Sequence, residues 1–323
     1  MHVVVTGAGG FIGSQIAEAA LRDGDTVLGV DCLTSYYDVR IKRASLLALQ
    51  ATPGFTFADA DLRTADLVPL LEGADVIYHE AGQPGVRLSW SDGFPDYVGH
   101  NVSATQRLLE AARQTRPGRI VYASSSSVYG NAARYPTSEI DLPRPHSPYG
   151  VTKLAAEHLC GLYAANWGVP TVALRYFTVY GPRQRPDMGM HRFIDAVYRG
   201  ASLPVFGDGE QVRDFTFVGD VVAANMAAGR ADLAPGTVMN IAGGGSITVN
   251  ELVALLGRIA GRELDVERLP EQPGDVRATG GTTELAHRLM GWEPGVDVPE
   301  GLAAQYAWQT RWLDARRDAD RPG

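Results

Sequence analysis

The sequence predicts an α/β protein: a doubly wound parallel sheet with a smaller C-terminal domain interleaved with it. Three observations lead to this fold class. Strand-like and helix-like segments alternate from the first residues onward, a glycine-rich turn follows the first strand, and the later part of the chain is broken into short segments by proline and glycine. The chain has 323 residues, which suffices for one large α/β domain and a smaller second one.

The first 126 residues read as alternating strands and helices. We expect buried strands at 2–7, 26–31, 55–62, 74–82 and 119–126, and amphipathic helices at 14–24 and 101–115. Strands joined through helices of this length form right-handed βαβ units, so the sheet is expected to be parallel. Ligands of such sheets bind beyond the carboxyl ends of the strands.

The later part of the chain predicts a substrate-binding domain. The segment 213–228 (RDFTFVGDVVAANMAA) is expected to form a strand and a helix that return to the large sheet. We therefore divide the chain into a dinucleotide-binding domain at 1–175, to which 214–240 returns, and a substrate-binding domain at 176–213 and 241–323.

Composition narrows the class of partner. The chain is 45% apolar and 20% charged, which is ordinary for a globular protein, and it has a net charge of −8. An acidic surface disfavours nucleic acid and anionic membranes as main partners, but a small phosphate-bearing molecule held by a few arginines is compatible with it. The two cysteines, Cys32 and Cys160, do not form a disulfide framework, so we expect a cytoplasmic protein. The start shows no signal-peptide pattern, and no apolar run is long enough for a membrane span.

The first strand is followed by a dinucleotide-binding signature. Gly7, Gly10 and Gly13 lie between this strand and the next helix, where they allow a tight turn, close approach of a pyrophosphate and close packing of the helix on the sheet. Asp31 ends the second strand, where a carboxylate binds a ribose 2′-hydroxyl and favours NAD over NADP. The alternative is that Asp31 only caps a strand. Asp61 and Leu62 are placed to hold the adenine edge.

A tyrosine and a lysine lie four residues apart at the start of a later helix. Ser147 suits the N-cap and Pro148 the first helical position, which places Tyr149 and Lys153 on one face. A tyrosine has an unperturbed pKa of about 10, and a nearby ammonium together with a cationic nicotinamide would favour its phenolate form as a base.

The motifs TGAGGFIG, YASSSSVYG and YGVTK together resemble the extended short-chain dehydrogenase/reductases, in particular the nucleotide-sugar epimerases, over nearly the whole chain. The resemblance implies a Rossmann-type domain, a catalytic trio of Ser125, Tyr149 and Lys153, and a homodimer built on two helices. The positions that it adds to the cofactor site are Phe11, Ile12, Ala81, Asn101 and Tyr176, besides Tyr149 and Lys153 themselves.

The residues just after the fifth strand predict the type of reaction. Related dehydratases carry an Asp–Glu pair there and related decarboxylases a Glu, whereas this chain has Ser126 and Ser127, so epimerisation at C4 is expected. The stretches YASSSSVYG, FTVYG and RPDM are similar to UDP-glucuronate 4-epimerases. We expect Ser126, Ser127, Thr178 and Arg185 to hold the sugar carboxylate, the alternative for Arg185 being a surface residue before a turn.

Two other functions remain open at this point. One is epimerisation of the neutral pair UDP-glucose and UDP-galactose. The other is a dinucleotide-sensing protein without catalysis, although such proteins usually lose the Tyr/Lys pair that this chain keeps.

The remaining expectations concern the nucleotide half of the substrate. By position in the family, diphosphate, ribose and base contacts are expected from Arg87, Phe206, Arg213, Asp275 and Arg277. Phe206 is as well explained by loop packing. Glu80, in HEAGQPG, departs from the usual apolar residue and has no assigned role. The histidine spacing predicts no metal site.

Overall fold

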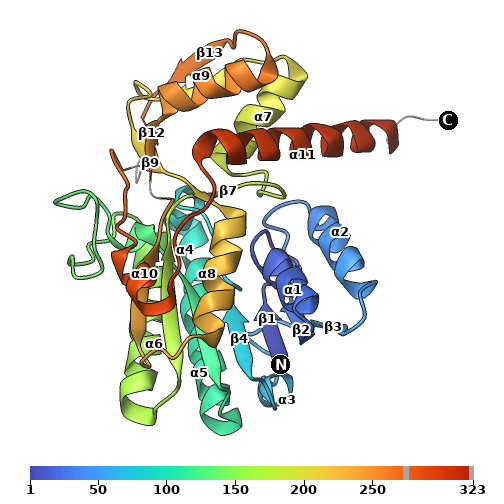
Figure 1. Ribbon diagram of the computed structural model, residues 1–323, viewed down its shortest axis with the longest axis vertical. Helices are drawn as coiled ribbons and strands as arrows, with labels where there is room; N and C mark the ends of the chain where they lie inside the picture. The colour runs from blue at the N-terminus through green and yellow to red at the C-terminus, as the bar shows by residue number, and fades with distance from the viewer. Residues whose placement is uncertain (244, 272–275, 320–323) are drawn as a thin grey trace.

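The computed structural model describes residues 1–243, 245–271 and 276–319 of the chain. A parallel sheet of seven of the described strands fills the lower part of the molecule in Figure 1, in the order β11-β6-β5-β4-β1-β2-β3. Its strands are β1 (His2–Thr6), β2 (Thr26–Asp31), β3 (Phe55–Asp59), β4 (Val76–His79), β5 (Arg119–Ser125), β6 (Thr171–Tyr176) and β11 (Thr237–Ile241). The predicted doubly wound parallel sheet is therefore confirmed.

Alternating side chains of each strand enter two separate cores. On one face Val3 and Val5 of β1 pack with α1 (Gly13–Arg22), α2 (Val39–Gln50), α8 (Val218–Arg230) and α10 (Glu284–Met290). On the other face Val4 packs with α3 (Val68–Leu71), α5 (Ala104–Thr115) and α6 (Pro148–Trp167). A strand buried on both faces reads as a continuous apolar run, which explains why these strands were recognisable in the sequence.

Helix α6 begins as the sequence predicts. Ser147 is the N-cap, its hydroxyl accepts a hydrogen bond from the Gly150 amide at 3.2 Å, and Pro148 is the first helical residue. Gly168 ends the helix in the left-handed conformation. Because both ends are fixed by local chemistry, the positions of the side chains along α6 are determined by sequence spacing alone.

Helix α5 differs from its prediction at the N-terminal end. Short helices η1 (Arg87–Ser89), η2 (Ser91–Gly93) and α4 (Phe94–Tyr97) precede it, and a π-helical segment η3 (Val98–Ser103) leads directly into it. The predicted helix 101–115 is thus correct in type, and its first residues belong to the wider π turn.

The C-terminal part forms a third core above the sheet. Helices α7 (Gly189–Arg199), α9 (Val249–Ala260) and α11 (Val298–Ala319) enclose it together with β8 (Leu203–Phe206) and β13 (Val266–Leu269), which pair in parallel. Figure 1 shows α11 crossing over α1 and α2, and Arg316 of α11 contacts Asp38 at the start of α2 at 3.5 Å. None of the described helices is both long and apolar enough to cross a membrane.

The expected strand within 213–228 does not join the large sheet. Its residues form two short strands, β9 (Val212–Asp214), which pairs with β12 (Ser246–Thr248), and β10 (Thr216–Phe217), which pairs with β7 (Val179–Tyr180). The helix after them, α8, does cover the sheet, and the strand that returns is β11, beside β6. The pairing partners lie far away in sequence, which explains why the local pattern misplaced the strand.

Candidate active site

A cavity lies at the carboxyl ends of β1, β2 and β4. The predicted cofactor residues in its lining are Gly7, Gly10, Phe11, Ile12, Gly13, Asp31, Asp61, Leu62 and Ala81. Arg185, predicted as a substrate residue, lines it too, and so do Cys32, Lys42, Glu80 and His100, to which the sequence had assigned no role in the reaction.

The turn between β1 and α1 has no room for side chains, as a dinucleotide-binding turn requires. A Cβ on Gly13 would lie 2.3 Å from the Gly7 carbonyl oxygen, and a Cβ on Gly7, whose φ is +72°, would lie 2.9 Å from the Ala81 amide nitrogen. Side chains are therefore excluded from the turn between β1 and α1, and the N-terminus of α1 is left open to a phosphate group.

Asp31 is fixed at the end of β2 by backbone contacts. One carboxylate oxygen accepts from the Gly9 amide at 3.0 Å and the other from the Leu33 amide at 2.8 Å. The ammonium of Lys42 lies 3.9 Å from it, and both side chains are 8% exposed. Asp31 thus orients the glycine turn as well as occupying the position expected for ribose recognition.

Cys32, Asp61 and His100 meet in the lining of the cavity, with one potential ligand atom from each within 4.8 Å of the others. Arg63, however, holds Asp61 through both carboxylate oxygens, with its closest contact at 2.7 Å. The guanidinium also lowers the pKa of both Cys32 and His100, although burial raises the pKa of the thiol overall and is the main cause of the lowered pKa of the imidazole. A cation beside Arg63 would be repelled, so we assign this cluster to the lining of the cofactor cavity.

The proposed catalytic residues lie at the ends of β5 and α6. Ser125 is the last residue of β5, and its hydroxyl accepts from the Ser127 amide at 3.1 Å. Lys153 is buried and its ammonium donates to the Ala123 carbonyl at 2.8 Å. The ring of Tyr149 packs edge-on against that of Tyr97, with 6.1 Å between centroids.

The chain's own groups do not make Tyr149 acidic. Burial raises the pKa of its phenol, while interaction with Ser125 and the charge of Arg185 lower it in part. The sequence suggested that the charge of Lys153 lowers the pKa of Tyr149. In the chain without cofactor, the charge that lowers it is the guanidinium of Arg185. Burial also lowers the pKa of Lys153, to about 8, and Glu80 opposes this.

Two further predicted cofactor residues are crosslinks between elements. Asn101 is buried, accepts from the Gln83 amide at 2.7 Å and donates to the Thr152 hydroxyl at 3.0 Å, which ties the loop after β4 to α6. Tyr176, the last residue of β6, donates through its hydroxyl to Glu80 at 2.8 Å.

The residues expected to hold a sugar carboxylate come after neighbouring strands. Ser125 is paired with Tyr176, so Ser126 and Ser127, which begin the short helix η4 (Ser126–Val128), and Thr178, two residues beyond β6, follow adjacent strand ends. Arg185 donates to both oxygens of Asp187 at 3.0 Å, and its side chain is 18% exposed. It is therefore not the free surface arginine of the alternative interpretation, and the structure pairs it with Asp187.

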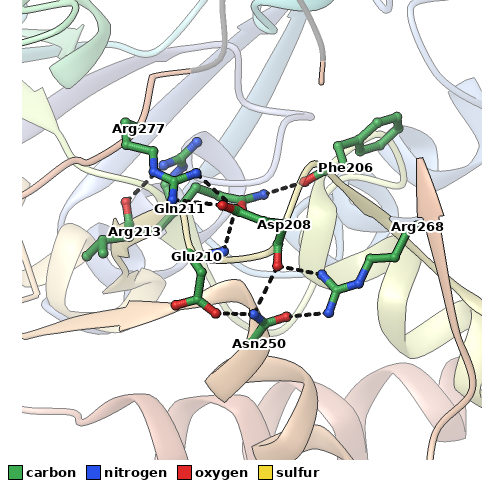
Figure 2. A network of polar contacts seen from close by, with 9 residues as sticks. Phe206, Asp208, Glu210, Gln211, Arg213, Asn250, Arg268 and Arg277 are labelled. Carbon is green, nitrogen blue, oxygen red and sulfur yellow. Dashed lines mark hydrogen bonds and ion pairs between the residues drawn. The ribbon is translucent and has the colours of Figure 1, made fainter. Parts of the chain in front are cut away.

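The residues expected at the nucleotide end take part in a network of the C-terminal part. Figure 2 shows that Arg277 points at Asp208, to which it donates twice at 2.9 Å, and that Arg213 donates to the Val212 carbonyl at 2.9 Å. The same figure shows Asp208 joined through its carbonyl to Asn250 and Arg268. Basic side chains of the C-terminal part are thus held by acidic and carbonyl oxygens.

Two of the remaining predicted residues contact each other, and one lies outside the described part of the chain. Arg87 and Phe206 stack, with the guanidinium carbon 4.2 Å from the ring centroid. This contact joins the loop after β4 to the end of β8. Asp275 lies outside the residues that the structure describes.

The family model for NAD dependent epimerases and dehydratases matches residues 3–242, well over half of the chain. The chain belongs to the NAD dependent epimerase/dehydratase family. The cavity of this family member lies within the matched range, and so does its arrangement of Ser125, Tyr149 and Lys153. The network around Arg277 extends beyond that range.

Individual relatives cover nearly the full length of this family member. A Bacillus subtilis protein named as an uncharacterized UDP-glucose epimerase, YtcB, is 42% identical over 95% of this chain and 98% of its own. A UDP-glucuronate 4-epimerase of Thermodesulfobacterium geofontis is 34% identical over 95% of both. The crystal structure of UDP-glucuronic acid 4-epimerase from Bacillus cereus, in complex with UDP-glucuronic acid and NAD, is 39% identical with a TM-score of 0.94, over 97% of this chain and 100% of that one.

Proposed function

We propose that this chain is an NAD-dependent 4-epimerase that interconverts UDP-glucuronate and UDP-galacturonate. The observation that carries the reaction type is the pair of neighbouring strand ends after β5 and β6, where the hydroxyl side chains of Ser126, Ser127 and Thr178 stand in place of the carboxylates that an elimination would need. The full-length similarity to UDP-glucuronate 4-epimerases supports the uronate as the sugar.

Each residue of the catalytic trio has one task in this proposal. Tyr149 removes the proton from the C4 hydroxyl as a base and returns it after the keto sugar has turned over. Ser125 holds the same oxygen by a hydrogen bond, and Lys153 holds the ribose next to the nicotinamide. NAD, held by the glycine turn and Asp31, would supply the acceptor and donor of the C4 hydride. The chain's own contribution is thus positioning and the transfer of one proton.

A second task is to prevent loss of carbon dioxide. The 4-keto uronic acid is a β-keto acid, and it decarboxylates when its carboxylate bond stands perpendicular to the carbonyl plane. We propose that Ser126, Ser127 and Thr178 fix the carboxylate away from this geometry, with Arg185 adding a charge-assisted bond through the nitrogen that Asp187 does not occupy.

The second candidate function is epimerisation of UDP-glucose and UDP-galactose. The observation in its favour is the similarity to the Bacillus subtilis protein, which is named for the neutral sugar. A purely sensory role is less supported, since the chain keeps both Tyr149 and Lys153 in the first turns of α6.

The two sugars are distinguished by turnover. Purified protein is incubated with UDP-glucuronate or UDP-glucose, and the products are separated by anion-exchange chromatography. We expect kcat/KM for UDP-glucuronate to exceed that for UDP-glucose at least tenfold, Tyr149→Phe to abolish both activities, and Arg185→Ala to reduce the first with little effect on the second. Equal turnover of the neutral sugar, undiminished in Arg185→Ala, would remove the carboxylate clamp.

We also propose a homodimer that forms through α5 and α6. Three apolar side chains of α6 are about half exposed in the single chain, Val151, Leu162 and Trp167, and burial of such a stripe against a second copy would be favourable. Sedimentation analysis of wild type and of Leu162→Glu tests this: the wild type is expected as a dimer and the variant as a monomer.

We also propose the division of the chain into two domains and the cellular compartment of the protein. We keep 1–175 with 214–240 as the cofactor domain and 176–213 with 241–323 as the substrate domain; α10 packs against the sheet of the former. Free cysteines at both positions, Cys32 and Cys160, agree with a reducing compartment, so we propose a cytoplasmic protein.

A further inference from the structure

The chain contains 27 arginines and only two lysines, Lys42 and Lys153. Both are buried, with 7% and 6% of their surface exposed, and both lie at the cofactor cavity or directly behind it. An arginine stays charged at any pH a protein meets, whereas a buried lysine can lose its proton. The charge of Lys153 therefore depends on its surroundings.

Glu80 is the carboxylate at the same end of the cavity. It comes directly after β4, and His79 of β4 is paired with Tyr122 of β5, so Glu80 lies beside Ala123, whose carbonyl accepts from Lys153. The ammonium nitrogen is also 3.4 Å from the place that a Cβ on Gly82 would take, two residues after Glu80. Glu80 and Lys153 thus both lie at the carboxyl ends of β4 and β5, and the structure shows no hydrogen bond between them.

The Tyr176 hydroxyl lies between the Glu80 carboxyl group and the Asn225 amide. It donates to Glu80 at 2.8 Å and accepts from the Asn225 amide nitrogen at 2.8 Å, and the Asn225 amide oxygen, at 3.0 Å, is a second acceptor within reach of its single proton. The same amide donates to the Val221 carbonyl in α8, which fixes its orientation. This chain of donors suits an ionised Glu80. The second oxygen of Glu80 makes no hydrogen bond to the part of the chain that the structure describes.

We propose that Glu80 is a positioning residue of the reaction: its carboxylate, anchored by Tyr176, keeps Lys153 in the ammonium form that the catalytic site needs. The inference rests on the proposed function for the role of Lys153, but the interaction itself belongs to the chain. Glu80 acts through Lys153 and takes no proton from the substrate.

The other titratable groups around Lys153 cannot replace Glu80. They come from β4, β5, β6 and α6, namely His79, Tyr122, Tyr149, Tyr176, Glu157 and Cys160. His79 is held between the Thr6 and Thr105 hydroxyls, and burial lowers its pKa to about 3, so it is neutral. Burial raises the pKa of the three tyrosines and of the cysteine, so these are neutral as well.

Glu157 already has a partner of opposite charge. Both of its oxygens accept from Arg175, at 2.5 and 3.0 Å, and both side chains are 5% exposed. Glu80 therefore remains as the charge that opposes the desolvation of Lys153. Consistently, burial raises the pKa of Glu80 to about 7 and lowers that of Lys153 to about 8, and each group partly offsets the shift of the other.

The presence of only two lysines makes the charge of Lys153 directly measurable. Protein labelled with 13C at the lysine Cε carbon should give two signals, and Lys42→Arg identifies which one belongs to Lys153. The pH dependence of that chemical shift gives the pKa, with and without saturating NAD. Lys42, paired with Asp31 at the other end of the cavity, is the internal control.

Two variants separate charge from shape. Glu80→Gln has the size of Glu80 and can still accept from Tyr176, but it has no charge; Glu80→Asp keeps the charge and is one methylene shorter. We expect Glu80→Gln to lower the pKa of Lys153 by about one unit or more and Glu80→Asp to lower it by less than half of that amount. The Lys42 signal is expected to be the same in both variants as in the wild type, because Lys42 lies beside Asp31.

The catalytic consequence is measured as a pH profile. In Glu80→Gln the alkaline limb of kcat/KM is expected to move to lower pH by the same amount as the Lys153 titration. An unchanged pKa of Lys153 in Glu80→Gln, or an equal drop in Glu80→Asp, would overturn the proposal. If the lysine titration shifts as expected but no sugar nucleotide is turned over, the failure lies in the proposed function and the coupling of the two groups stands.

Discussion

Glu157 and Arg175 form a buried ion pair that contacts Ser124, the residue before the proposed catalytic serine, and its removal gives a prediction with a calculable size. Glu157 accepts from the guanidinium at 2.5 and 3.0 Å and from the Ser124 hydroxyl at 2.6 Å. Glu157→Leu leaves the buried guanidinium with the Tyr129 hydroxyl, at 2.7 Å, as its remaining hydrogen-bond partner in the described part of the chain. Breaking one side of such a pair typically costs about 3–5 kcal/mol. With roughly 2–4 °C per kcal/mol, the melting temperature should fall by about 10 °C.

The double variant supplies the decisive comparison. Glu157→Leu with Arg175→Met replaces both charges by apolar groups, which is expected to recover most of the loss, because no unpaired charge is left. Urea unfolding followed by circular dichroism, at one fixed protein concentration, measures all three variants. Asp195→Asn, which breaks an exposed pair with Arg199 on α7, is the control and should cost about 1 kcal/mol or less. If the double variant were as unstable as Glu157→Leu alone, the unpaired charge would not be the cause.

Three further outcomes are expected from single contacts. Gly13→Ala places a Cβ 2.3 Å from the Gly7 carbonyl oxygen, and calorimetry should show NAD binding weakened at least about tenfold. Unchanged affinity would mean that the backbone of the turn shifts to accommodate the Cβ. Burial raises the pKa of Glu80 from 4.5 to about 7. As pH rises through that window, ionisation of Glu80 lowers the free energy of unfolding of the protein by up to about 3 kcal/mol. Glu80→Gln should therefore melt above the wild type at pH 8 and together with it below pH 4.5. Asp208→Asn releases Arg277 and should tighten UDP binding by calorimetry, with little change in melting temperature; weaker binding would contradict this.

The elements of the large sheet could be predicted because each one carries its own signal. The strands β1, β2 and β4 are apolar runs buried on both faces, and α6 has its N-cap, first-turn proline and final glycine in the sequence. Where a strand depends on a partner, the local pattern fails. The segment predicted to return to the sheet forms the short strands β9 and β10, and their position is determined by pairing with β12 and β7.

The same distinction applies to the site. Gly7, Gly13 and Asp31 could be found because turn geometry and a fixed spacing along one βαβ unit identify them. The bidentate pair between Arg277 and Asp208 joins residues 69 positions apart, so the local sequence around either residue does not predict it. The contact of Arg185 with Asp187, two residues on, was readable from the sequence in principle.

Glu80 shows how far an anomaly in a motif can be traced. The sequence marks it only as a charged residue where an apolar one is usual. Its meaning depends on β6 and α6, which bring Tyr176 and Lys153 to the end of β4 from distant parts of the chain. An acidic residue half-buried at a strand end costs stability, since its charged form is partly desolvated. A chain that keeps it there, beside one of only two lysines, gains in return a fixed charge on the group that holds the catalytic geometry.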